Sequence, residues 1–470
     1  MKNQELSRRS FLSGAAALGS AAGAAALWDP AQMAAQVVGV KKGDLPDLTI
    51  KEVKVYVTDL MGIHKLNGTE TGEIISVVTQ SGIEGNYTLG DRNRTPNWLE
   101  WAKPALVGKN VVEVLPTLTS TSGMKTRSGG FDAPLRRRPG GAARGRNAMG
   151  FSFGGPEQPG EGPAFGGAAV AGSGLQTHGG GEWPNYYTAA ADVALWDILG
   201  KAVNRPIYQI LSGGVRTKDR VLAYASSQHL PTIEDYAPDV TKAKQQGYKG
   251  YKIHPGSGQH ATGPEIPTYM GHMEEIRGVR KAAGEDYVLM HDPVQMYNQF
   301  EAMQVGRLLD ELDYLWYEDP VPTMDEEGLI ELVKKLDIDI HVGEFLYSIA
   351  DFAEYIKRDA LSVVRLIADN VGGISGGMRV GLLADAHGYE CAPHNWGNGF
   401  DLAVHFHLEL ALPNVYWFEM PFPAEYTDRP YLSYKFRIDQ DGYVPAPTEP
   451  GLGYPLDRAA LDKMTLRVDT

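Results

Sequence analysis

Three acidic residues stand at equal spacing in the second half of the chain. Asp292, Glu318 and Glu344 lie at the ends of the apolar runs "DYVLMHD", "YLWYED" and "DIHVGE", with 26 residues between successive members. Three carboxylates at one edge of a protein repel one another and raise each other's pKa. A hard divalent cation such as Mg²⁺ removes this repulsion and keeps positions open for water and substrate. The spacing therefore favours a magnesium site, although a separate ion pair could explain any one of the three taken alone.

Two further segments carry groups that transfer protons. Lys252 and His254 in "YKGYKIH" are two residues apart, so on a strand their side chains point to the same face. His394 lies in "ECAPHNWGN", after a later apolar run. Singly, a histidine at a strand end is commonly structural. Beside a cation that holds an anionic oxygen, however, these groups suit removal of a proton next to a carboxylate.

Apolar runs at regular intervals predict the elements that position these residues. From Tyr186 onward a helical pattern, "AAADVALWDILGKA", is followed by eight short runs, each with helix-like sequence after it: "VLAYAS", "YKGYKIH", "DYVLMHD", "YLWYED", "DIHVGE", "LSVVRLI", "YECAPH" and "VYWFE". Eight strands alternating with helices predict a parallel (β/α) barrel. The active site of such a barrel lies at the C-terminal ends of its strands, where the acidic residues and histidines are expected.

A different composition precedes the predicted barrel. The segments "LTIKEVKVYVTDL" and "GEIISVVTQSGIEGNYTLG" have the pattern of β-strands, and with "WLEWAKPALVGKN" they predict a small α+β unit over residues 45–120. Residues 121–182 are rich in glycine and contain the basic cluster "PLRRRPGGAARGR". We expect this segment to be a long mobile insertion, whose arginines are either solvated or collect an anionic substrate.

The first residues resemble an export signal. "SRRSFLSGAAALGSAAGAAAL" joins the twin arginines Arg8 and Arg9 to a weakly apolar run, as in twin-arginine signals. The alternative is a membrane anchor, but a run rich in alanine and glycine and poor in leucine is a weak spanning candidate. We therefore expect residues 1–35 to be a signal peptide. The mature protein is expected to be periplasmic or extracytoplasmic, with no membrane partner after the signal is removed.

Length, charge and cysteine content narrow the class of protein. With 470 residues, the chain is long enough for one large domain and a smaller one. Its formal net charge of -14 argues against nucleic acid as a partner, because phosphate binding calls for a basic face. The single cysteine, Cys391, excludes an internal disulfide framework and a multi-cysteine metal site.

These motifs resemble the mandelate racemase/muconate lactonizing branch of the enolase superfamily. The resemblance covers Tyr186 to about Pro423, and more loosely the chain from residue 45; it rests on the 189–202 helix, the lysine-bearing second strand, the three carboxylates, "GGISGG" and the histidine after the seventh run. It implies a modified (β/α)₇β TIM-type barrel over residues 186–425. An α+β capping domain over 45–185 would contain the 121–182 insertion, and residues 426–470 would return to that domain. It also implies one Mg²⁺ on the three carboxylates and a homo-oligomer.

The resemblance suggests roles for residues around the metal. His254 stands where the family usually has a second-strand lysine base, and a neutral histidine can do that work near pH 7. Lys252 would then contact the substrate carboxylate. Glu419 in "YWFEMP" matches the eighth-strand acid, which hydrogen-bonds the substrate carboxylate or enediolate.

The sixth strand departs from the family pattern. Many members carry an aspartate five residues before the Gly-Gly pair, where this chain has Ile367. Asp369, two residues further on, is the candidate partner of His394. Tyr224 and His64 are candidates for binding substrate hydroxyls, although both also fit ordinary rim or loop positions.

Two histidines in different surroundings favour elimination over racemisation. We expect a Mg²⁺-dependent dehydratase of an acid sugar, which removes the proton next to the carboxylate, forms a metal-stabilised enediolate and yields a 2-keto-3-deoxy acid. A racemase or epimerase of a 2-hydroxy acid at the same site is the first alternative. An exported, non-catalytic protein that binds sugar acids is the second. Each reading implies a small-molecule carboxylate as the partner.

Overall fold

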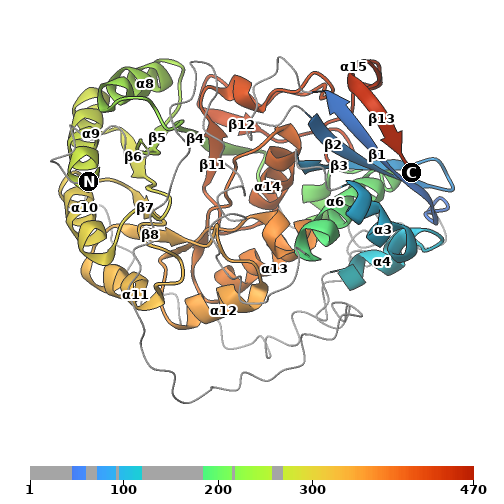
Figure 1. Cartoon of the computed structure of the whole chain (residues 1–470), viewed down its shortest axis with the longest axis horizontal. Coiled ribbons are helices and arrows are strands. Elements are labelled where there is room, and N and C mark those ends of the chain that lie inside the picture. Colours follow the sequence, from blue (N-terminus) through green and yellow to red (C-terminus); the bar gives the residue numbers. More distant parts are fainter. Residues whose placement is uncertain (1–44, 60–70, 91–94, 119–183, 214–216, 257–267) are drawn as a thin grey trace.

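The computed structural model describes residues 45–59, 71–90, 95–118, 184–213, 217–256 and 268–470. Figure 1 shows an antiparallel sheet with helices at one side of the molecule and, at the other, a curled parallel sheet surrounded by helices. The predicted signal peptide and the 121–182 insertion lie outside the described residues.

The antiparallel sheet joins the two ends of the described chain. Its strand order is β13-β1-β2-β3, with β1 at Ile50–Asp59, β2 at Thr71–Thr79, β3 at Glu84–Gly90 and β13 at Thr465–Asp469. Along β1, Val53 and Val55 are buried between more exposed residues, which is the period-2 pattern of a half-buried strand. The accompanying helices are α3 (Thr95–Leu106), α4 (Val111–Leu118) and α15 (Arg458–Met464). The C-terminal strand thus pairs with the first described strand.

The second sheet contains eight parallel strands in the order β10-β9-β8-β7-β6-β5-β4-β11. The strands are β4 (Arg220–Ser226), β5 (Gly250–Ile253), β6 (Val288–His291), β7 (Trp316–Glu318), β8 (Asp339–Val342), β9 (Val363–Val364), β10 (Glu390–Cys391) and β11 (Trp417–Pro421). The helices that follow the first seven are α8 (Ile233–Gln245), α9 (Thr268–Ala283), α10 (Gln299–Glu311), α11 (Glu326–Lys335), α12 (Ile349–Lys357), α13 (Gly373–Ala386) and α14 (Gly399–Ala411). A ninth strand, β12 (Tyr443–Pro445), pairs antiparallel with β4, and the short helices are α7 (Ile207–Leu211), η2 (Ala368–Val371) and η3 (Ala424–Thr427).

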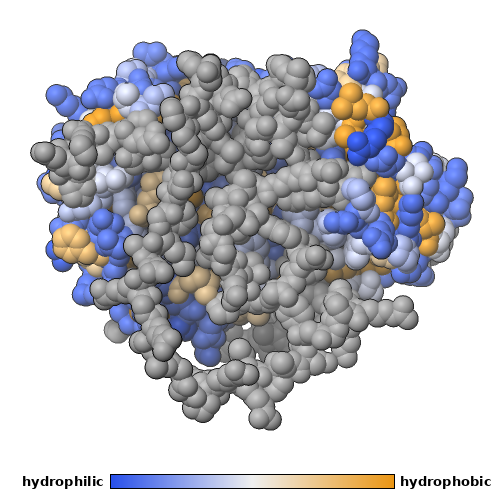
Figure 2. Space-filling model, in the orientation of Figure 1, coloured by the Kyte–Doolittle hydropathy of each residue, from blue (hydrophilic) through white to orange (hydrophobic). Residues whose placement is uncertain are grey.

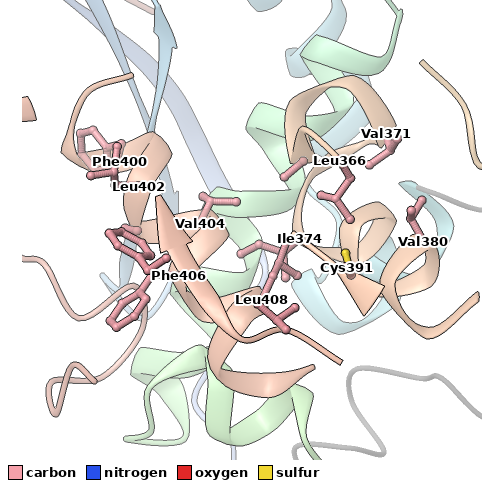
Figure 3. Packing of buried hydrophobic residues seen from close by; sticks show 14 of the residues in the cluster. Leu366, Val371, Ile374, Val380, Cys391, Phe400, Leu402, Val404, Phe406 and Leu408 are labelled. Carbon is pink, nitrogen blue, oxygen red and sulfur yellow. The ribbon is translucent and has the colours of Figure 1, made fainter. Parts of the chain in front are cut away.

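Helix α6 (Pro184–Ala202) joins the two units. It packs against β3 of the antiparallel sheet and against α13 of the barrel. Gly85 of β3 lies so close to α6 that an added Cβ would be 1.9 Å from the Ala194 carbonyl oxygen. The core continues through α13 and α14, where Figure 3 shows Leu366, Ile374, Leu408 and the buried thiol of Cys391. Burial raises the pKa of that thiol, so it is a core residue rather than a nucleophile.

The visible surface of the described residues is largely hydrophilic, with apolar residues at the side where β13 lies (Figure 2). Leu466 and Val468 of β13 are 60% and 46% exposed. Among the described helices, none combines the length and apolar character needed to span a bilayer.

Candidate active site

The three carboxylates predicted to hold a metal come together at the C-terminal ends of adjacent strands. Asp292 directly follows β6, Glu318 ends β7 and Glu344 lies two residues beyond β8. One ligand oxygen from each lies within 4.8 Å of the others. Their equal spacing in the sequence corresponds to equal positions on three neighbouring parallel strands, which is why they converge.

The charges around this cluster fit a divalent cation. Four carboxylates, Asp292, Glu318, Glu344 and Glu419, lie among two buried cations, Lys252 and Arg365. Burial and then the charge of Asp292 raise the pKa of Glu344 to about 8, so the cluster carries more negative charge than it can balance. With all four carboxylates ionised the cluster would carry two negative charges in excess, and Mg²⁺ prefers such a set of oxygen ligands.

Lys252 of β5 is ion-paired with three carboxylates. Its side chain is 0% exposed, and Nζ lies 3.1 Å from Asp292 Oδ2, 2.9 Å from Glu318 Oε2 and 2.7 Å from Glu419 Oε1. Burial and Arg365 act to lower its pKa, but the carboxylates outweigh them and raise it well above the ordinary value. Lys252 therefore stays charged. Its three N–H donors face three acidic residues, and its predicted contact with a substrate carboxylate stays a prediction.

Arg365, which sequence reasoning missed, is the second buried cation. It follows β9 and is ion-paired with Glu318 through Nε and with Glu419 through Nη2. Nη1 donates to the Ala392 carbonyl at 3.3 Å and to the Tyr224 hydroxyl at 3.4 Å. A signal was present: an arginine inside the apolar run "LSVVRLI" must find buried acids if the run is a barrel strand.

His254 is the candidate base, and each of its two ring nitrogens has a polar contact. Nδ1 lies 2.7 Å from the Ser227 carbonyl oxygen, and Nε2 lies 3.0 Å from Asp292 Oδ2. Because a carbonyl can only accept, Nδ1 carries a proton. Nε2 is then the ring nitrogen that faces the cluster: it donates to Asp292 when it is protonated, and it is a base once that proton has been lost. The indole of Trp396 lies edge-on to this ring with centroids 5.5 Å apart, and it donates to Ser226 Oγ at 3.1 Å.

His394 approaches the cluster from a strand on the other side of the barrel mouth. It lies three residues after β10, and its Nε2 is 3.5 Å from Glu344 Oε1. In the strand order, β10 is five places from β5, so His394 and His254 flank the carboxylates from different sides. Burial lowers the pKa of His394 well below its ordinary value, more than Glu419 raises it.

Glu419 of β11 is an anion with both oxygens engaged. Oε1 accepts from Ser226 Oγ at 2.7 Å and Oε2 accepts from the Asn395 amide at 2.8 Å. Burial acts to raise its pKa, but Arg365 and Lys252 outweigh burial and hold it well below the usual range. The predicted role of Glu419 toward the substrate carboxylate or enediolate stays a prediction.

Asp369 is the predicted partner of His394. Asp369, in η2, accepts a hydrogen bond from the Tyr87 hydroxyl at 2.9 Å. The carboxylate at His394 is that of Glu344, so the pairing of Asp369 with His394 stays a prediction.

Of the two residues expected to bind substrate hydroxyls, Tyr224 lies within the described residues. Tyr224 is only 1% exposed inside the barrel, with its ring 5.1 Å from that of Trp316. The predicted contact of Tyr224 with substrate hydroxyls stays a prediction. His64 lies outside the described residues.

Comparisons with known proteins agree with this architecture. Residues 235–460 match the family model described as enolase C-terminal domain-like. The structure of D-glucarate dehydratase from Agrobacterium tumefaciens, complexed with magnesium, superposes with a TM-score of 0.67 and 23% identity over 90% of this chain and 100% of that one. The fold prediction, a TIM-type barrel with a capping domain, is confirmed, and the predicted resemblance to the enolase superfamily is supported.

Two relatives of known activity are similar over about half of this chain. Arabinonate dehydratase of Saccharolobus solfataricus is 29% identical over 269 residues, which cover 57% of this chain and 68% of that protein. L-talarate/galactarate dehydratase of Salmonella typhimurium is 30% identical over 231 residues, or 48% and 54% of the two chains. Against the latter, the match spans about half the relative's length.

Proposed function

We propose that this protein is a Mg²⁺-dependent dehydratase of an acid sugar within the enolase superfamily. The observation that carries the proposal is the convergence of Asp292, Glu318 and Glu344 between two histidines on opposite sides of the barrel mouth. Support also comes from the relatives, which are named as dehydratases of arabinonate and of L-talarate and galactarate. A bound divalent cation would supply positive charge against the negative charge that develops on the substrate carboxylate.

Two histidines then carry out the two proton transfers. Nε2 of His254 accepts the proton from the carbon next to the carboxylate, while Ser227 holds the ring in the required tautomer. His394 supplies a proton to the β-hydroxyl, which leaves as water. A nearby substrate anion raises the pKa of His394 from its lowered value and so favours the protonated ring. The remaining enol becomes the 2-keto-3-deoxy acid by proton shift, with no oxidant or reductant needed.

The decisive experiment is a screen of mono- and di-acid sugars with the Mg²⁺-loaded protein in deuterated water. We expect keto-acid formation from at least one substrate, abolished in His254→Gln and retained in His387→Gln, a control at an exposed histidine. Exchange of the α-proton on both stereoisomers without loss of water would instead indicate an epimerase. Ligand binding that is unchanged in His254→Gln, with no turnover or exchange, would indicate a binding protein.

Export is proposed on the sequence of residues 1–35 alone. The twin arginines Arg8 and Arg9 predict that the protein leaves the cytoplasm through the twin-arginine pathway. Changing both to lysine is expected to retain the protein in the cytoplasm, as measured by cell fractionation. Equal extracytoplasmic amounts of the two forms would contradict this prediction.

A further inference from the structure

The segment that carries His254 lies just beyond the end of strand β5, and side chains hydrogen-bond to its main chain. Strand β5 ends at Ile253, so the carbonyl groups of the next three residues are not part of the strand ladder. Each of the three carbonyl oxygens accepts a hydrogen bond from a side chain. The His254 carbonyl accepts from Tyr236, the Pro255 carbonyl from His229 and the Gly256 carbonyl from His272.

The donors to these carbonyls are themselves buried and tied to other elements. Tyr236 of α8 is fully buried, and its hydroxyl also accepts from the Leu230 amide at 2.9 Å. Burial raises the pKa of Tyr236, so the hydroxyl keeps the proton that it donates. Because that single oxygen bonds to residues 230 and 254, it connects the segments that follow β4 and β5.

Two histidines, His229 and His272, complete the arrangement. Nδ1 of His229 lies 2.6 Å from the Pro255 carbonyl oxygen, and burial lowers its pKa to about 3. Nε2 of His272 lies 3.0 Å from the Gly256 carbonyl oxygen, and its Nδ1 lies 2.7 Å from the Tyr297 hydroxyl. Since carbonyls only accept, each histidine must present an N–H to the chain.

The amide and ring of His254 are anchored on the opposite side. Its amide donates to Ser227 Oγ at 3.0 Å, and its ring donates to the Ser227 carbonyl. Ser227 is in turn fixed to β5 through the Lys252 carbonyl at 3.0 Å. Main chain and ring are thus bonded in separate directions, which leaves His254 little freedom to move.

We propose that Tyr236, with His229 and His272, is a set of positioning residues that fixes His254 at the metal cluster. This inference rests on the proposed function, in which His254 accepts the α-proton. A misplacement of about 1 Å at a reacting group can reduce a rate on the order of 10²-fold. Loss of one of these three side-chain donors leaves a buried carbonyl without a hydrogen bond. We expect the segment after β5 to shift toward another donor and to move His254 with it.

The first test replaces Tyr236 by phenylalanine in the full-length, Mg²⁺-loaded protein. We expect kcat to fall about 10- to 100-fold, with KM and Mg²⁺ affinity changed little and a larger primary isotope effect for the α-deuterated substrate. Tyr314→Phe is the matched control, because it also removes a buried tyrosine hydroxyl from a main-chain carbonyl, that of Ile276, at 2.8 Å. Equal kinetic losses in the two variants would overturn the proposal.

A pair of variants at His272 distinguishes loss of the hydrogen bond from loss of folding. His272→Gln keeps an N–H donor at the position of Nε2 and is expected to retain most of kcat. His272→Leu removes the donor and is expected to lower kcat with KM unchanged. If leucine and glutamine give the same kcat, His272 does not act through the Gly256 carbonyl.

A spectroscopic measurement separates this inference from the proposed function. In ¹⁵N NMR spectra of histidine-labelled protein, the Nδ1–H signal of His254, assigned with His254→Asn, should exchange slowly with solvent. We expect faster exchange in Tyr236→Phe and not in Tyr314→Phe. An unchanged exchange rate would overturn the positioning role even if the protein is an active dehydratase. Faster exchange in a protein with no turnover would leave the positioning role standing and reject the dehydratase.

Discussion

Arg365 shows how one buried residue can set the electrostatics of a whole site. Its guanidinium lies between a carboxylate expected to hold metal, Glu318, and Glu419 on the opposite strand β11. Buried carboxylates are stable as anions only when they are paired. Lys252 alone could not balance them, since the same ammonium already serves Asp292.

We therefore expect Arg365→Gln to make stability depend on the metal. Without metal, the free energy of unfolding should fall by about 3 kcal/mol, because an unpaired buried charge remains. Added Mg²⁺ should restore more stability to Arg365→Gln than to the unchanged protein. Urea unfolding with EDTA or Mg²⁺ measures both quantities. Arg277→Gln, at an exposed pair with Glu274, is the control and should behave like the parent in both conditions.

The metal assignment is testable through Asp292. A ligand that binds only the folded state raises stability, so Mg²⁺ should raise the melting temperature of the parent protein. In Asp292→Asn this rise should disappear, whereas Asp385→Asn, at an exposed position, should keep it. Thermal melts over a range of Mg²⁺ concentrations decide the matter. A rise that persists in Asp292→Asn would place the cation elsewhere.

At the scale of elements, helix α6 supports the start of α13 through a buried acid. Asp192 Oδ2 accepts from the Ser375 amide at 3.0 Å, in the first turn of α13. Burial raises its pKa from 3.8 to about 7, more than the hydrogen bonds from Ser375 lower it. The folded protein thus binds a proton here that the unfolded chain releases near pH 4.

This shift predicts how stability changes with pH. Between pH 4 and 7 the unfolded chain holds fewer protons at Asp192 than the folded protein, so the free energy of unfolding falls as pH rises. The contribution is at most about 4 kcal/mol, from three pKa units. Asp192→Asn mimics the protonated acid and should lessen the fall. Urea unfolding at several pH values measures it, and parallel curves for the two proteins would refute the assignment.

Two glycines give opposite predictions for the same substitution. Gly85→Ala places Cβ against the Ala194 carbonyl oxygen of α6, so it should lower the free energy of unfolding by about 2 kcal/mol through overpacking. Gly278, within α9, has no atom within 4 Å of an added Cβ. Gly278→Ala should raise stability by about 0.5–1 kcal/mol. Chemical unfolding measures the free energy of unfolding of both variants. A lower value for Gly278→Ala than for the parent would contradict the second prediction.

Regular spacing made most of the barrel predictable. Runs of five to seven residues marked every parallel strand, and the period of 26 residues placed three carboxylates at one rim. The runs overestimated strand length, since β9 is only Val363–Val364 and β10 only Glu390–Cys391. Strand β12 was missed because "YVP" is too short to show a period. A lone Arg365 has no periodicity either, and only three-dimensional pairing reveals its role.

At the scale of the whole molecule, the capping sheet meets the barrel next to the candidate active site. Tyr87 of β3 is buried, and its hydroxyl lies 2.9 Å from Asp369 and 3.2 Å from Asp401. Asp401 accepts from the Asn398 amide at the start of α14, four residues after His394. One hydroxyl from the small unit therefore contacts η2, which follows β9, and the first turn of α14, which follows β10.

Tyr87→Phe should weaken this connection without altering the metal cluster. Burial and the neighbouring carboxylates raise the pKa of Tyr87 well above its ordinary value, so it remains a donor. Its loss leaves two acids without that donor and should lower the free energy of unfolding by about 1–3 kcal/mol. We expect kcat/KM to fall as well, with Mg²⁺ affinity unchanged, because the loop that carries His394 loses a support. Tyr56→Phe, on the same sheet, is the control in urea unfolding and steady-state kinetics. Equal effects of the two variants would contradict a specific role for the Tyr87 hydroxyl.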